Sequence, residues 1–203
     1  MNDYSELEIK VYVTDLAAVE QRLLDAGARL KMPRTHERNL RYDAADGRLR
    51  AAHAVLRLRQ DARIRLTFKD ETGALDSETA VARRRFEAEV EVSDFEAMHT
   101  ILEKLGFTPF MAYEKYRTVY TLEGAEIDLD EMPYGNFVEI EGDEATIIRI
   151  LERLGLADAP RLAPGYSVLF EFVKHNLGLG FQDLTFENFA GIDVPLSAFE
   201  GHE

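Results

Sequence analysis

Charged and aliphatic side chains alternate in most of the segments that have strand character. Glu6, Glu8 and Lys10 fall on one face of the first such segment, and Leu7 and Ile9 fall on the other. Carboxylates bind divalent metal ions, whereas guanidinium and ammonium groups bind phosphate oxygens. This face therefore has side chains that can bind a metal ion and one that can bind an anion. Alone, the segment is typical of an antiparallel strand with one solvated face. The alternation recurs with acids around Glu87, Asp128 and Glu139, and with bases around Arg57, Arg65 and Lys115.

A barrel would give these charged faces a common interior. Closing the strands would turn the charged face inwards and leave the aliphatic face to be covered by helices. A charged interior is costly unless each charge is paired or bound to a ligand. Interleaved acids and bases meet that condition only in part, which leaves room for a polyanion and metal ions. Triphosphate suits such a cavity, because guanidinium groups grip its oxygens and carboxylates hold magnesium against it.

One structural unit occurs three times along the chain. Each copy has a Glu-x-Glu strand, an acidic or hydroxyl helix cap, an amphipathic helix and a terminal glycine. The copies are too few and too unevenly spaced for a solenoid, so they indicate pseudo-symmetry within one sheet or barrel. A polar connector with Pro33 and a short strand over residues 38–42 are expected between the first two copies. The expected caps are Thr14 or Asp15, Ser93 or Asp94, and Asp143.

Composition and charge narrow the class of protein. A chain of 203 residues with 46% hydrophobic and 31% charged residues predicts one domain over residues 1–203, with a peripheral tail from about residue 178. The net charge of -14 argues against a nucleic-acid partner. No apolar run is long enough to span a membrane and the first residues lack signal-peptide character, so a cytoplasmic location is expected. The absence of cysteine excludes disulfides and thiolate chemistry. The sequence leaves open whether the protein forms a homodimer.

Together these segments resemble the CYTH superfamily, the triphosphate tunnel metalloenzymes that include class IV adenylyl cyclases and thiamine triphosphatases. The Glu-x-Glu-x-Lys opening is a weak signal alone, but the ordered set of motifs is specific. The resemblance implies an α+β fold: an eight-stranded antiparallel β-barrel, or tunnel, with a charged interior and helices packed outside. It is carried by Glu6-x-Glu8-x-Lys10, Leu56-Arg57-Leu58-Arg59, Thr67-Phe68-Lys69, Glu87-x-Glu89-x-Glu91, Glu114-Lys115-Tyr116-Arg117, Leu129-Asp130-Glu131 and residues 135–141.

The resemblance also implies roles for individual residues. Lys115 is similar to the lysine proposed to activate water in hydrolytic members, and Arg117 and Asp130 complete the implied catalytic group. Gly165-Tyr166-Ser167 resembles a family segment that pairs Ser and Tyr, but the order is altered here, so no role is carried to Tyr166 and Ser167. The implied metal ligands are Glu6, Glu8, Asp130, Glu139 and Glu141. The implied phosphate-binding residues are Lys10, Arg57, Arg59, Lys69, Arg85 and Arg117, and the implied accessory acidic wall is Glu87, Glu89 and Glu91. A solvated or structural place is expected for Glu126, Asp128, Arg63, Arg83 and Arg84.

The implied function is a Mg²⁺- or Mn²⁺-dependent enzyme acting on a small triphosphate compound. Hydrolysis of inorganic triphosphate, thiamine triphosphate or a nucleoside triphosphate is favoured. The main alternative is a class IV adenylyl cyclase that converts ATP to cyclic AMP and pyrophosphate. In those cyclases a His-Phe pair lies ahead of the Glu-x-Glu strand, whereas this chain has only Met1 to Ser5 there. A second alternative is a non-catalytic module that binds polyphosphate or nucleotide.

Overall fold

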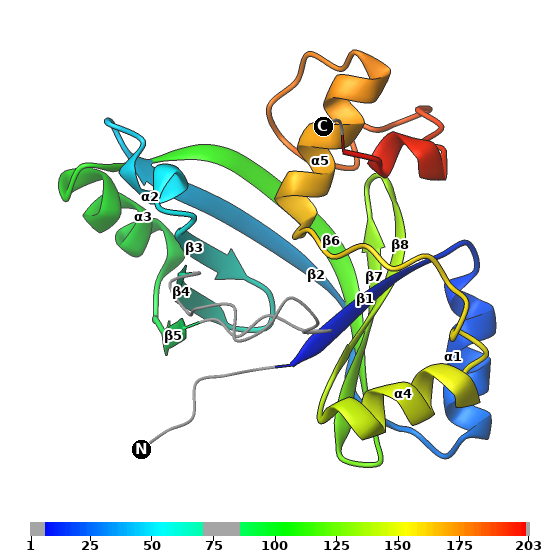
Figure 1. Cartoon of the computed structure of the whole chain (residues 1–203). Helices are drawn as coiled ribbons and strands as arrows, with labels where there is room; N and C mark the ends of the chain where they lie inside the picture. Colours follow the sequence, from blue (N-terminus) through cyan, green and yellow to red (C-terminus); the bar gives the residue numbers. More distant parts are fainter. Residues whose placement is uncertain (1–6, 71–85, 202–203) are drawn as a thin grey trace.

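A single antiparallel sheet of eight strands organises the protein (Figure 1). The computed structural model describes residues 7–70 and 86–201, and the strand order is β1-β8-β7-β6-β2-β3-β4-β5. The strands are β1 (Glu8–Val13), β2 (Arg29–Ala44), β3 (Val55–Gln60), β4 (Ile64–Asp70), β5 (Phe86–Glu91), β6 (Phe107–Leu122), β7 (Ala125–Met132) and β8 (Gly135–Glu141). The helices are α1 (Leu16–Asp25), α2 (Arg48–Ala51), α3 (Phe95–Lys104), α4 (Glu144–Arg153), α5 (Tyr166–Leu177) and a 3₁₀ turn at Leu196–Phe199.

The strand, cap, helix and glycine unit is present in all three predicted places. Asp15, Asp94 and Asp143 are the caps, and each side chain accepts a hydrogen bond from the backbone N–H three residues later. A glycine with left-handed backbone follows each helix, where a side chain would be strained. These glycines are Gly27 (φ 82°), Gly106 (φ 88°) and Gly155 (φ 64°).

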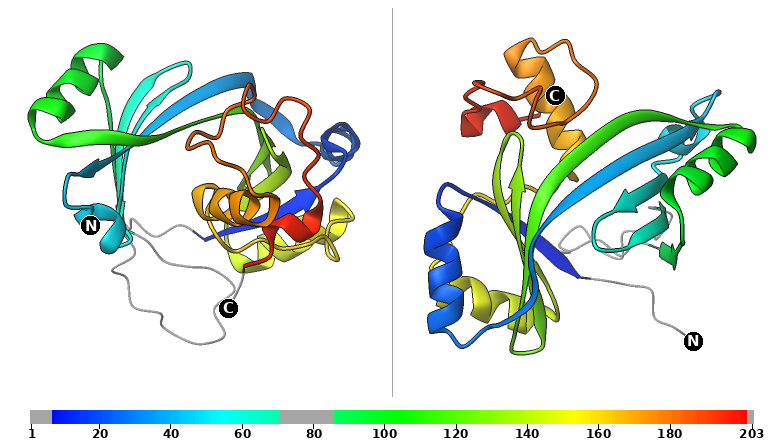
Figure 2. Two further views of the ribbon diagram at one scale, coloured as in Figure 1. Left: turned by 90° about the horizontal axis from the view of Figure 1, so that it is seen from above. Right: turned by 180° about the vertical axis from the view of Figure 1, so that it is seen from behind.

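The helices α1 and α4 cover the outer face of β1, β8 and β7 (Figures 1 and 2). Leu23 of α1 and Ile150 of α4 are fully buried in one cluster with Ile127 and Ile140 from the strands. The helix α3 packs through Phe95 and other side chains in a second cluster with β2 and β3. The aliphatic strand face therefore points outwards to the helices, as predicted, and the charged face is left for the interior.

The strand β2 is much longer than the short strand expected at residues 38–42. It runs over Arg29–Ala44 and pairs with β6 along most of that length. The register shifts between Leu30 and Met32 and again between Met32 and Thr35, and the second of these intervals contains Pro33. Proline has no backbone N–H to donate, so an irregular stretch of the ladder tolerates it. The additional length brings Glu37 into the sheet.

The segment after α4 packs over one end of β6, β7 and β8 (Figure 1). Leu184, Phe189 and Phe199 are buried against α5 and against Phe137 of β8. The backbone of Leu184 also exchanges hydrogen bonds of 2.9 and 3.0 Å with β6. This packing holds the first turn of α5 against the sheet. None of the helices in the described ranges has the length and apolar character needed to cross a membrane.

The predicted eight-stranded antiparallel architecture with helices outside is confirmed. The sheet curves, and residues from all eight strands line one cavity. Within residues 7–70 and 86–201, however, the edge strands β1 and β5 are not hydrogen-bonded to each other. The barrel is therefore formed by curvature rather than closed by a continuous hydrogen-bonded ladder there.

Candidate functional site

A charged cavity of about 290 Å³ occupies the interior of the curved sheet. Tyr113, Gly165, Tyr166 and Ser167 line it together with charged residues of every strand. Its acids are Glu8, Glu87, Glu89, Glu126, Asp128, Glu139 and Glu141, and its bases are Lys10, Arg41, Arg57, Arg59, Arg65, Lys69, Lys115 and Arg117.

The acids of β1, β8 and β7 form one side of the cavity, here called the carboxylate wall: Glu8, Glu141, Glu139, Glu126 and Asp128, with the fully buried Asp130 next to them on β7. In the sheet register Glu141 lies directly opposite Glu8 on one neighbour and Glu126 on the other. Asp128 likewise lies opposite Glu139. Like charges placed opposite each other on neighbouring strands are destabilising unless a cation lies between them. The wall is therefore built to receive positive charge.

Part of that positive charge comes from β6. Arg117 contacts Asp128, donates from Nε to Asp130 Oδ1 over 2.6 Å, and donates to Glu139 Oε2 over 2.5 Å. Burial opposes the charged form of Arg117, but these carboxylates raise its pKa well above the usual range. Lys115 Nζ donates to Asp130 Oδ2 over 2.9 Å. Asp130 is thus fully buried with both oxygens hydrogen-bonded to cationic side chains.

Asp128 differs from Asp130 although both point into the same interior. A solvated or structural place was expected for Asp128, yet it is only 8% exposed and lines the cavity. Its Oδ1 atom is buried without a hydrogen-bond partner in the described residues. Burial raises the pKa of Asp128 to about 7, even though Arg117 favours the carboxylate. Negative charge at this end of the wall is therefore only partly neutralised by the protein.

The bases of β2, β3 and β4 form the facing side, here called the arginine wall: Arg41, Arg57, Arg59, Arg65 and Lys69. Arg57 donates to the hydroxyl of Tyr113 over 3.2 Å and lies 4.0 Å from Glu89. Lys69 pairs with Glu87. Nε of Arg41, of Arg57 and of Arg65 is buried without an acceptor among the described residues. This wall therefore retains hydrogen-bond donors that can bind an anion.

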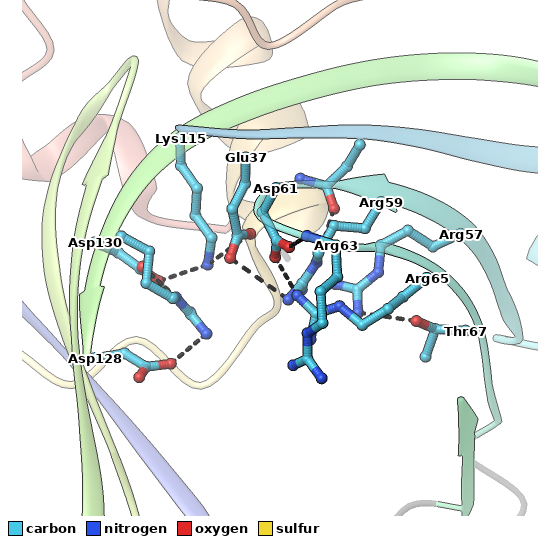
Figure 3. Close-up of polar contacts among 12 residues, drawn as sticks. Glu37, Arg57, Arg59, Asp61, Arg63, Arg65, Thr67, Lys115, Asp128 and Asp130 are labelled. Carbon is cyan, nitrogen blue, oxygen red and sulfur yellow. Dashed lines mark hydrogen bonds and ion pairs between the residues drawn. The ribbon is translucent and has the colours of Figure 1, made fainter. Parts of the chain in front are cut away.

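Glu37 joins the two walls, and sequence reasoning missed it. It is 0% exposed, and its carboxylate lies 3.5 Å from Arg59 and 3.8 Å from Lys115. Figure 3 shows Glu37 and Lys115 between Asp128 and Asp130 on one side and the arginines of β3 and β4 on the other. Burial alone would raise the pKa of Glu37, but Lys115 and Arg59 hold it at about 2. The available signal was the alternation of Glu37 with Asn39 and Arg41, on the part of β2 that begins before the expected strand.

Tyr166 attaches the first turn of α5 to this network. Its hydroxyl donates to Asp130 Oδ2 over 2.7 Å. The ammonium groups of Lys10 and Lys115 lie 4.3 and 5.2 Å from the centre of its ring, within range of cation–π attraction. No role was assigned to Tyr166 from the sequence, because the order of Tyr166 and Ser167 differs from that of the similar family segment. Its position in the structure depends on how the tail packs.

The remaining predicted site residues fall into three groups. Lys10 and Glu139 pair at 3.3 Å inside the cavity, as neighbours on β1 and β8. Glu91 lies at the exposed rim and pairs with Arg63 at 3.7 Å, while Glu87 and Glu89 line the cavity. Glu6, Arg83, Arg84 and Arg85 lie outside the described residues.

The carboxylate wall fits a divalent cation that is shared with a substrate. Within the described ranges, no three His, Asp or Glu side chains converge closely enough to hold a metal by themselves. Mg²⁺ commonly binds through one or two carboxylates, water and substrate phosphates, so a complete protein cage is not required. The opposed pair Glu8 and Glu141 and the unpartnered oxygen of Asp128 offer suitable oxygen donors. The donor set is therefore the one that Mg²⁺ or Mn²⁺ prefers.

Residues 5–153 match the model of the CYTH domain family, and the chain belongs to that family. The matched span contains both walls but ends before α5 and the tail.

Similar proteins have related descriptions. A protein named "Putative adenylate cyclase MJ0240" from Methanocaldococcus jannaschii is 29% identical over 138 residues, which cover 67% of this chain and 75% of that protein. A structure described as a "putative adenylate cyclase" from Vibrio parahaemolyticus has a TM-score of 0.65 at 17% identity and covers 81% of this chain and 97% of its own. A "putative adenylyl cyclase" from Hippeastrum, described as having a dominant triphosphatase activity, has a TM-score of 0.56 at 21% identity, with coverage of 87% and 97%. These structural likenesses support the fold.

Proposed function

We propose that this protein is a divalent-metal-dependent enzyme that hydrolyses a triphosphate compound. The observation that carries the proposal is a single cavity in which a carboxylate wall faces an arginine wall. Membership of the CYTH family supports action on a triphosphate. The triphosphatase activity described for the Hippeastrum protein favours hydrolysis.

The arginine wall would bind the phosphate chain. Arg57 and Arg59 are held at fixed positions by Tyr113, Asn39 and Glu37, so little conformational entropy is lost when their remaining donors meet phosphate oxygens. Lys69 and Lys10 add charge at the two sides of the cavity. Arg85, which lies outside the described residues, keeps its expected phosphate-binding role in this proposal.

The carboxylate wall would hold Mg²⁺ or Mn²⁺ through Glu8, Glu139 and Glu141, together with Glu6. Such an ion neutralises phosphate charge and orients the reacting groups. Arg117 faces the same space and would stabilise charge that develops on the transferred phosphoryl group. Lys115 would activate the attacking water, which is the role that the family resemblance implies for it.

Asp130 has a different place in this scheme from the other acids. Lys115, Arg117 and Tyr166 already donate to its two oxygens. We propose that Asp130 positions Lys115 and Arg117. To act as a metal ligand, Asp130 would have to release at least one of these hydrogen bonds. Glu87 and Glu89 would orient Lys69 and Arg57 in the same way.

The cyclase reaction is the second candidate, favoured by the names of the similar proteins from Methanocaldococcus and Vibrio. Both reactions use the same cavity, and they differ in the nucleophile. In hydrolysis the nucleophile is water, whereas in cyclisation it is the ribose 3′-hydroxyl, which attacks the α-phosphate and displaces pyrophosphate.

Product analysis decides between these candidates. Purified protein would be incubated with ATP, thiamine triphosphate and inorganic triphosphate, each with Mg²⁺ and with Mn²⁺, and all phosphate products would be separated. Release of orthophosphate supports the proposal. Cyclic AMP and pyrophosphate as main products from ATP would establish the cyclase instead. Tight binding of triphosphate without any product would favour a non-catalytic binding module.

A further inference from the structure

Arg41 differs from the other basic side chains of the cavity in its lack of an acidic partner. Each of the others has a carboxylate within 4.0 Å. Among residues 7–70 and 86–201, Arg41 has none. A guanidinium group remains charged in proteins, so this position carries positive charge that the described part of the molecule does not neutralise.

The contacts that Arg41 does make hold the side chain in place and leave donors available. Its Nη1 donates to Ser167 Oγ in the first turn of α5, and its guanidinium lies 5.4 Å from the ring centre of Phe110. Its Nε is buried without an acceptor in the described residues. Since Ser167 accepts this hydrogen bond through oxygen, its hydroxyl hydrogen is directed elsewhere. The pair therefore presents donors to the cavity.

Arg57 adds a second unsatisfied donor at the same level. Arg41 and Arg57 lie directly opposite each other on β2 and β3. Like charges in this arrangement repel, and the Nε of Arg57 is also buried without an acceptor in the described part of the chain. An anion bound between the two guanidinium groups would offset this repulsion. A phosphate group has the charge and the oxygen geometry for this contact.

The sheet register places this pair two steps along β2 from the level of Lys115, and Lys69 lies one step farther, opposite Val55. Glu37 of β2 lies opposite Lys115, Asn39 lies opposite Arg59, and Arg41 lies opposite Arg57. Each step is two residues, or about 6.6 Å along a strand. Arg41 is therefore about 13 Å along β2 from the level of Lys115. The side chains of Lys115 and Arg41 both reach into the same cavity, so a substrate with its reacting group at Lys115 can extend its other phosphate groups towards Arg41.

We propose that Arg41, supported by Ser167 and acting with Arg57, binds the phosphate group farthest from Lys115 and so selects triphosphate over pyrophosphate. The identity of the substrate in this proposal rests on the function proposed above. The role is argued from this chain's own contacts, and Ser167 belongs to α5, which lies beyond the residues that match the family model.

Matched variants test the role of Arg41. Arg38→Gln is the control, because Arg38 is an exposed arginine on the same strand and does not line the cavity. Calorimetry in EDTA would measure the dissociation constants of inorganic triphosphate and pyrophosphate without metal-dependent turnover. We expect Arg41→Gln to weaken triphosphate binding about tenfold or more and pyrophosphate binding about threefold or less. Arg41→Lys restores part of the loss, and Ser167→Ala weakens triphosphate binding about threefold.

The outcomes separate this inference from the proposed function. Equal triphosphate affinity in wild type, Arg41→Gln and Arg38→Gln would overturn the inference, while orthophosphate release by wild type would leave the function standing. Selective weakening by Arg41→Gln without turnover in any protein would support the inference and count against the enzyme. Failure of wild type to bind triphosphate in EDTA would overturn the inference, and the proposed function would then be decided by orthophosphate release with Mg²⁺ or Mn²⁺. If Arg41→Gln does not fold, as judged by circular dichroism, Ser167→Ala and Arg41→Lys decide, and triphosphate binding unchanged in both would overturn the inference.

Discussion

The carboxylate wall and the arginine wall arise from the same strand alternation but differ in how their charges are satisfied. On the carboxylate wall Arg117 and Lys10 neutralise part of the negative charge, and an oxygen of Asp128 remains without a partner in the described residues. On the arginine wall the unpartnered atoms are guanidinium donors. One side therefore needs a cation and the other needs an anion. A metal complex of a triphosphate supplies both, which explains why a protein would keep so much charge in its interior.

The same contrast occurs between two residues of one strand. Asp130 is held by Lys115 and Arg117, which lower its pKa against the opposing effect of burial, whereas burial raises the pKa of Asp128 to about 7. The variant Asp130→Asn should lower the free energy of unfolding by about 3–5 kcal/mol, because it leaves two buried bases without their acid. The variant Asp128→Asn should lower it by about 1 kcal/mol or less at pH 7. Urea unfolding of both variants checks this, and equal losses would contradict the distinction between them.

The next largest effect is expected for Glu37, and it appears as a dependence of the free energy of unfolding on pH. Its pKa falls from 4.5 to about 2 on folding, so its stabilising effect is present above pH 4.5 and is lost as the pH falls towards 2. Wild type should lose about 3 kcal/mol more than Glu37→Gln between pH 5 and pH 2. Urea titrations across this range measure the difference. Parallel stability curves for the two proteins would show that Glu37 does not carry the ion pairs assigned to it.

On the carboxylate wall, Glu8→Gln should lower metal-dependent turnover by about 100-fold or more with little change in stability. The substitution removes a proposed metal ligand, and Glu8 is an exposed residue at the start of β1, so little packing is lost. Glu131→Gln is the matched control, since Glu131 lies outside the cavity and pairs with Arg34. Steady-state rates at several Mn²⁺ concentrations would measure the effect. Wild-type turnover in Glu8→Gln would remove Glu8 from the metal site.

On the arginine wall, Arg57→Ala should act mainly on substrate binding. Loss of charge-assisted hydrogen bonds predicts an increase in KM of about 10–30-fold and a smaller change in kcat. Arg63→Ala provides the comparison, because Arg63 is an exposed arginine in the turn before β4. An effect confined to kcat would place Arg57 at the reacting group rather than along the phosphate chain.

Much of this arrangement follows from local sequence, because strand alternation and helix caps depend on neighbouring residues. The three aspartate caps and the inward faces of β1, β3 and β8 are of this kind. Glu37 was missed because Pro33 interrupts the strand pattern, and only pairing with β6 shows that the strand begins earlier. Arg41 falls inside the expected strand, but its place in the cavity depends on the pairing of β2 with β3. Tyr166 and Ser167 reach the cavity through packing of the tail, which no local pattern predicts. The difference between Asp128 and Asp130 depends on which donors surround each side chain.

The central claim is that both walls bind one metal–triphosphate ligand. The most direct measurement is the affinity for Mn²⁺ in the presence and absence of inorganic triphosphate, corrected for the Mn²⁺–triphosphate complex that forms in solution. Binding energies at coupled sites are reciprocal, so each ligand should tighten the binding of the other by about tenfold or more. Glu8→Gln should remove this coupling. An affinity for Mn²⁺ that is the same with and without triphosphate would contradict the account.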